Sequence, residues 1–101
     1  MIYYLDQKYT KKTNLQNWSK YNFTLVLQSL KDNKYYIGSS SNVYKRLDFH
    51  NSGRQRSTKS RIPFRLVLFE EFESKGKALY REKQIKKWTG GDPFKRLIAG
   101  K

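Results

Sequence analysis

The sequence predicts an α+β fold in which a small three-stranded antiparallel sheet is flanked by helices. Short apolar runs alternate with stretches of helical periodicity, and a turn-forming tetrapeptide separates the first two runs. A length of 101 residues favours one domain. Aromatic residues make up 16% of the chain, and large rings can build a core from few residues, so we expect a folded protein.

An N-terminal extension is predicted over residues 1–20, which are polar, contain scattered aromatic residues and show no clear periodicity. This extension is expected to be partly helical. A domain over residues 21–101 follows. Its first element is a buried strand over residues 22–30, and a turn over 31–34 connects this strand to a second one over 35–38. This arrangement predicts a β-hairpin with a longer loop.

The second half of the domain is predicted to contain helices. Several N-cap candidates lie between Ser39 and Asn42, and Ser74 or Gly76 starts the second helix. The predicted elements, in chain order, are a helix over residues 43–50, a basic loop over 54–61, a strand over 64–69, a helix over 77–88 and a short helix near 94–99.

The charge balance predicts an anionic partner. Net charge is +14, and residues 31–65 are the most one-sided region, with nine Lys and Arg against Asp32 and Asp48. No apolar run approaches the length of a membrane span, and no signal peptide is visible, so we expect a cytoplasmic protein without a membrane partner. Cysteine is absent, which excludes disulfides and zinc-thiolate sites.

The first predicted helix carries polar residues on an apolar stripe. Val43, Arg46, Leu47 and His50 stand at i, i+3, i+4 and i+7 and therefore share one face. The stripe needs no function if the arginine extends its head group to water and the histidine is buried with hydrogen-bond partners in the core. The alternative is that both side chains belong to a site.

The second predicted helix repeats this pattern with an acid. Glu82 shares a face with Ala78 and Ile85 and is the only acid between Lys75 and Gly91. It could pair with Lys86 at i+4. It could also bind a metal, because Mg²⁺ keeps most of its waters and needs few protein ligands.

The stretch Tyr35-Tyr36-Ile37-Gly38 ends a strand just before a helix, where backbone N–H groups can approach a phosphate. The segment KYYIGSSSNVYKRLDFHNSG resembles the second half of the GIY-YIG nuclease signature, with Arg46 ten and His50 fourteen residues after Tyr36. The segment STKSRIPFRLVLFEEFESKGKALYREKQIKKW resembles small stand-alone bacterial members of that family, whose metal-binding glutamate falls on Glu82.

This resemblance covers about residues 22–101 and implies roles for four side chains. Glu82 would hold one Mg²⁺ or Mn²⁺ ion, and Arg46 would bind phosphate oxygens. Tyr36 would orient or deprotonate the attacking water, and His50 would accept that proton or position the water. The sequence departs from the family at Leu25, which occupies the position of the first signature tyrosine and lacks a proton acceptor.

We therefore expect a metal-dependent DNA endonuclease without a small-molecule cofactor, weakened at Leu25. The alternatives are a catalytically impaired DNA-binding module for DNA repair or branched-DNA recognition, and an unrelated basic module that binds RNA or ribosomes. Glu73-Ser74-Lys75 matches an acid-x-Lys motif of other nucleases. In a chain with so many lysines, such a triplet is expected by chance. The oligomeric state stays open. The cations predicted to contact nucleic acid are Lys34, Lys45, Arg54, Arg56, Lys59 and Arg61.

Overall fold

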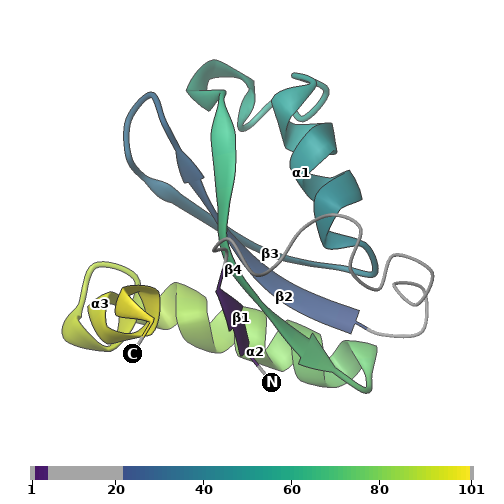
Figure 1. The fold of residues 1–101 in the computed structure, drawn as a ribbon, viewed down its shortest axis with the longest axis vertical. Helices are drawn as coiled ribbons and strands as arrows, with labels where there is room; N and C mark the ends of the chain where they lie inside the picture. Colours follow the sequence, from purple (N-terminus) through teal and green to yellow (C-terminus); the bar gives the residue numbers. More distant parts are fainter. Residues whose placement is uncertain (1, 5–21, 101) are drawn as a thin grey trace.

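A computed structural model describes residues 2–4 and 22–100 and shows an α+β fold with one antiparallel sheet, as predicted (Figure 1). The strand order is β1-β4-β2-β3. The elements are β1 (Ile2–Tyr4), β2 (Asn22–Ser29), β3 (Tyr35–Ser40), α1 (Val43–Asn51), the 3-10 turn η2 (Lys59–Arg61), β4 (Phe64–Phe72), α2 (Lys75–Trp88) and α3 (Asp92–Ala99). No helix in the described ranges is long and apolar enough to cross a membrane.

The three predicted strands are present, and two of them are longer than predicted. Strand β3 continues two residues past Gly38, and β4 continues three residues past Phe69. A fourth strand, β1, lies within the predicted N-terminal extension and adds to the three predicted strands, because residues 2–4 pair antiparallel with residues 68–70 of β4. Three residues are too few to show an alternating pattern in sequence.

Two caps begin the long helices. The side chain of Asn42 accepts a hydrogen bond from the Lys45 amide at 3.0 Å and starts α1. The hydroxyl of Ser74 does the same for the Lys77 amide at 3.1 Å, so α2 begins at Lys75. Ser74 therefore serves as a cap in the segment that resembled an acid-x-Lys motif.

Helix α1 covers one face of the sheet, and α2 and α3 cover the other (Figure 1). A register shift between Val26 and Leu27 of β2, opposite Val67, changes which residues of β4 face each layer. The core on the α1 side contains Phe23, Leu25, Leu27, Val43, Phe64, Leu66 and Phe69. The core on the α2 side contains Val26, Ile37, Val67, Leu68, Ile85, Phe94 and Leu97.

Candidate active site

A pocket of about 510 Å³ lies at the edge strand β3, between α1 and the N-terminal half of α2. It brings together three of the four side chains that the resemblance singled out, namely Tyr36, Arg46 and Glu82. The remaining lining residues are Asn22, Gly38, Ser39, Ser40, Ser41, Lys75, Ala78 and Leu79.

The alternation of β3 explains how the pocket receives groups from both faces of the sheet. Tyr36 lies opposite Leu27 and packs against the core on the α1 side, whereas Ser39 lies opposite Thr24 and faces α2. Because β3 is the edge strand, groups from both layers meet around its free side.

Gly38 is required by the packing of Tyr36. A Cβ atom at Gly38 would lie 2.8 Å from Cε2 of the Tyr36 ring and 3.1 Å from its hydroxyl. The ring therefore runs along the strand over Gly38 toward the pocket. The sequence suggested that Gly38 lets a phosphate approach the backbone. In the structure, the missing side chain of Gly38 makes room for the ring of Tyr36.

Arg46 reaches the pocket from α1. Its Nη2 atom donates a hydrogen bond to the Ser39 carbonyl at 3.1 Å, and its guanidinium lies 6.0 Å from the centre of the Phe49 ring. One donor is thereby engaged with β3. A guanidinium has five N–H donors, so others remain for an anion in the pocket.

Glu82 reaches the same residue from α2. Its Oε1 atom accepts a hydrogen bond from the Ser39 hydroxyl at 2.6 Å, and its Oε2 atom lies 2.8 Å from Nζ of Lys86. The intrahelical pair of Glu82 with Lys86, which the sequence suggested, is therefore present together with the hydrogen bond from Glu82 to Ser39 of β3. The Lys86 side chain is 55% exposed, and such surface pairs contribute only about 0–1 kcal/mol.

Ser39 is the residue that the sequence did not identify as part of a site. Its carbonyl holds Arg46 and its hydroxyl holds Glu82, so it links groups from the two layers. It stood among the predicted N-cap candidates because the strand was expected to end at Gly38. Ser39 lies three residues before the true cap, Asn42, and this position was its only signal in the sequence.

His50, to which the resemblance gave a role at the site, does not line the pocket. The imidazole is fully buried beneath the pocket, where its ring centre lies 4.3 Å from that of Tyr36. Its Nδ1 atom is 2.9 Å from the Thr58 hydroxyl. Burial and the nearby Arg46 charge lower the pKa of His50 below its usual value of 6.5, which favours the neutral ring. The helical stripe placed His50 on the inward face, where the core encloses it.

Leu25 shares the sheet face of Tyr36, because it lies opposite Gly38 on the neighbouring strand. The side chain is fully buried in the core on the α1 side and is not among the pocket-lining residues. Leucine therefore fills the space beside Tyr36 and leaves no hydroxyl there.

The oxygen donors of the pocket fit one hard divalent cation. Within the described ranges, no group of three or more His, Cys, Asp or Glu side chains converges, so Glu82 is the protein carboxylate available in the pocket. One carboxylate is enough for Mg²⁺, which retains waters and takes phosphate oxygens as further ligands. The Oε2 atom of Glu82 pairs with the Lys86 ammonium in the structure, so this oxygen is accessible to a cation.

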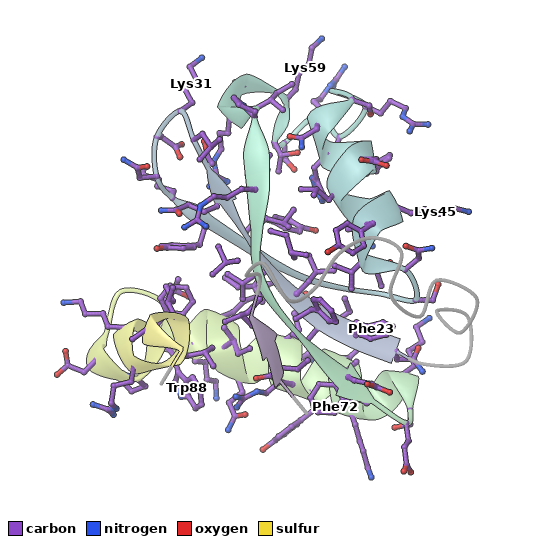
Figure 2. The ribbon with its side chains drawn as sticks, in the orientation of Figure 1. Phe23, Lys31, Lys45, Lys59, Phe72 and Trp88 are labelled. Carbon is purple, nitrogen blue, oxygen red and sulfur yellow. The ribbon has the colours of Figure 1, made fainter. Side chains whose placement is uncertain are left out.

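The predicted nucleic-acid contacts come from the β2–β3 turn, from α1, and from the loop and η2 that follow α1. Lys45 projects outward from α1, and Lys59 projects from the end of the molecule that also carries Lys31 (Figure 2). Arg61 differs from the other predicted cations, because its guanidinium pairs with Asp32 at 3.1 Å. A backbone hydrogen bond from Lys34 lowers the pKa of Asp32, and the contact with Arg61 lowers it further. Exposed cations of this group are Lys34, Lys45, Arg54, Arg56 and Lys59.

Comparison with known proteins identifies the family to which these residues point. A family model described as the GIY-YIG catalytic domain matches residues 21–95. A UPF0213 protein of Clostridium perfringens is 42% identical over 81 residues, which cover 79% of this chain and 85% of the relative. A UPF0213 protein of Syntrophus aciditrophicus is 43% identical over 78 residues, covering 75% and 88%. No solved structure gives a significant match.

Proposed function

The chain belongs to the GIY-YIG catalytic domain family, a family of nucleases, and from this premise we propose that it is a divalent-metal-dependent DNA endonuclease that hydrolyses phosphodiester bonds. The observation that supports this activity best is the convergence of Tyr36, Arg46 and Glu82 on one pocket at the edge of the sheet. The three side chains combine a hydroxyl, a phosphate-binding cation and a metal-binding carboxylate, which are the groups that phosphodiester hydrolysis needs.

Arg46 binds the scissile phosphate in this proposal. The hydrogen bond to the Ser39 carbonyl holds one edge of the guanidinium against β3, so the remaining donors are oriented before substrate arrives. Such preorganised donors stabilise the charge that builds on the phosphate oxygens in the transition state. The planar fork of arginine matches two of those oxygens, whereas a lysine offers a single point charge.

Tyr36 orients the attacking water, and His50 acts through Tyr36. The hydroxyl of Tyr36 holds the water, which gives up its proton to solvent, and the neutral imidazole packs against the Tyr36 ring with the ring centres 4.3 Å apart. The water oxygen then bonds to phosphorus, the bond from phosphorus to the 3′-oxygen breaks, and that oxygen is protonated from solvent. His50 contacts no substrate in this scheme, because it is buried.

Glu82 holds the divalent ion, which polarises the scissile phosphate and stabilises the leaving oxygen when it is bound. The Ser39 hydroxyl fixes the rotamer of the carboxylate, so that Oε1 is held against β3. Lys86 is the group that yields when a cation approaches Oε2, because its ammonium is largely exposed to water. Glu82 therefore needs little rearrangement to bind the ion.

DNA is the proposed substrate because the chain carries a large excess of cations, and Arg46 and Lys75 line the pocket. The net charge of the chain is +14. The exposed cations of α1 and of the following loop extend this positive surface away from the pocket. Phosphate contacts of this kind provide most sequence-independent affinity for DNA.

A plasmid-nicking assay with Mg²⁺ or Mn²⁺ tests the proposal. We expect wild-type protein to nick DNA, and Glu82→Gln to reduce the rate at least about 100-fold, which is the scale of losing a transition-state contact. Glu73→Gln is the matched control, because Glu73 is exposed and outside the pocket lining. DNA binding in a chelator should be the same for all three proteins. If wild type binds DNA but nicks it with neither ion, the impaired binding module is the correct function.

A further inference from the structure

Leu79 places an exposed apolar side chain in the wall of the pocket. Among the described residues, the large hydrophobic side chains that stay exposed are those of Leu30, Leu79 and Tyr80, and Leu79 is the one that lines the pocket. It leaves 40% of its surface exposed, whereas Ala78 beside it is buried. Single exposed leucines are common on protein surfaces, so it is the position of Leu79 beside Glu82 that suggests a ligand.

Helical spacing gives this wall of the pocket a fixed order of groups. Lys75 stands four residues before Leu79 and Glu82 stands three residues after it, so the three side chains share one face of α2, and all of them line the pocket. The axial rise places Leu79 about 6 Å from Lys75 and about 4.5 Å from Glu82 along the helix. The wall therefore presents a cation, an apolar group and a carboxylate in turn.

A strand of DNA carries groups in the complementary order. Phosphates alternate along the strand with nucleosides, whose sugar rings and base faces offer apolar surface. If Glu82 holds the divalent ion on the scissile phosphate, the neighbouring nucleoside reaches the level of Leu79, and the following phosphate reaches the level of Lys75. Each group on this wall of α2 thus meets a part of the strand that suits its chemistry.

Lys75 and Leu79 are both available for such a ligand. The Lys75 ammonium forms no ion pair with a described residue, whereas Lys86 on the same helix is paired with Glu82. Both Lys75 and Leu79 are exposed. An apolar side chain that is partly in water gains free energy when another apolar surface covers it.

We propose that Leu79 packs against the nucleoside next to the scissile phosphate and that Lys75 binds the following phosphate of the same strand. The identity of the scissile phosphate rests on the proposed nuclease function, whereas the contact with DNA does not. The surface that Leu79 covers belongs either to the deoxyribose, which is accessible in duplex and in single-stranded DNA, or to a base face, which stacking covers in a duplex.

DNA binding in a chelator tests the contact without any cleavage. The probes are a duplex and a single strand of the same sequence, each titrated at several salt concentrations. Leu79→Ala should weaken binding about fivefold, because 40% of the leucine surface remains to be buried. The slope of log K against log salt should stay the same, since an apolar contact releases no counterions. Lys75→Gln should instead reduce that slope by about 0.7 to 0.9.

Three further variants control for other effects of the substitution. Leu79→Met keeps an apolar side chain of similar volume and should bind like wild type, whereas Leu79→Gln should bind as weakly as Leu79→Ala. Leu30→Ala makes the same change at an exposed leucine just after β2, at the opposite end of that strand from the pocket residue Asn22, and should have no effect. Because both leucines are exposed, all variants should fold, and thermal unfolding checks this.

The possible results separate this inference from the nuclease proposal. Weaker binding of both probes by Leu79→Ala supports contact with the sugar, and a loss confined to the single strand supports contact with a base. Unchanged affinity for both probes, or an equal loss in Leu30→Ala, would overturn the inference even if wild type nicks DNA. An unchanged salt slope in Lys75→Gln would remove the phosphate contact. If wild type nicks with neither Mg²⁺ nor Mn²⁺ while Leu79→Ala binds more weakly, the nuclease proposal fails and the contact stands.

Discussion

The hydroxyl of Ser39 donates a 2.6 Å hydrogen bond to Oε1 of Glu82 and joins the edge strand to α2 at the carboxylate. The carbonyl of Ser39 accepts a hydrogen bond from Arg46 of α1. One residue of β3 thus sets the separation between the proposed metal-binding and phosphate-binding groups. A displacement of Ser39 would move both groups relative to the substrate.

Loss of the Ser39 hydroxyl should slow cleavage without abolishing it. In Ser39→Ala the carboxylate of Glu82 keeps its charge but loses its fixed rotamer, so we expect the nicking rate to fall about tenfold, equivalent to about 1.4 kcal/mol. Ser39→Thr should retain most of the rate. Ser41→Ala is the control, because Ser41 lines the same pocket and makes no hydrogen bond to Glu82. Equal rates for Ser39→Ala and wild type would argue against the bridging role.

Replacing Arg46 with lysine tests whether geometry or charge matters at the phosphate. Arg46→Lys keeps the charge but loses the planar fork, so we expect kcat to fall about 100-fold while DNA affinity changes little. Arg65→Lys provides the comparison, since Arg65 is an exposed arginine of β4 that binds Gln28. A normal kcat in Arg46→Lys would show that a point charge is enough.

The exposed loop cations should determine part of the salt dependence of DNA binding. Neutralising Arg56 and Lys59 together by Arg56→Gln and Lys59→Gln should reduce the slope of log K against log salt by about 1.8, if each cation contacts one phosphate. The same change of charge at Lys95 and Arg96 of α3, both exposed, is the matched control. Titrations at several salt concentrations measure the slopes. An equal effect from both pairs would mean that net charge, and not the loop, is responsible.

His50 should make the protein less stable in mild acid. Its pKa is lowered in the folded state, mainly by burial, whereas the unfolded chain has an ordinary value of about 6.5. The stabilisation is therefore present above about pH 6.5 and is lost as pH falls toward the folded pKa, by at most about 1.4 kcal/mol per pH unit. Denaturant unfolding of wild type between about pH 7 and 5 measures this loss. His50→Gln should give a flatter profile, because carboxylates titrate mainly below that range.

Restoring a tyrosine at position 25 should act on stability and catalysis in opposite directions. Leu25 is fully buried, so the larger ring of Leu25→Tyr should cost about 1–3 kcal/mol in the free energy of unfolding. Its hydroxyl would lie on the face of Tyr36, and we expect nicking to rise about tenfold. Leu25→Phe supplies the ring without the hydroxyl and should lose stability only. Equal nicking by the two variants would assign no role to the missing hydroxyl.

The spacing within single elements was sufficient to predict most of the fold and to single out Arg46 and Glu82, whereas the family resemblance indicated Tyr36. Asn42 and Ser74 could be identified as caps because capping depends on a few consecutive residues. Arg46 and Glu82 stood out because each is a charged residue on the inward stripe of its own helix. The roles of these side chains remain predictions that the experiments above address.

Contacts between distant segments could be decided only by the tertiary structure. Ser39 and Glu82 are 43 residues apart, and their hydrogen bond depends on how α2 packs against the edge strand. The inward stripe of α1 identified His50, but only the packing of Tyr36 and Thr58 around it showed that the ring is enclosed. Local periodicity tells which side of an element faces inward. The residues that contact this side come from segments far apart in the sequence, so only the packing of the helices against the sheet determines them.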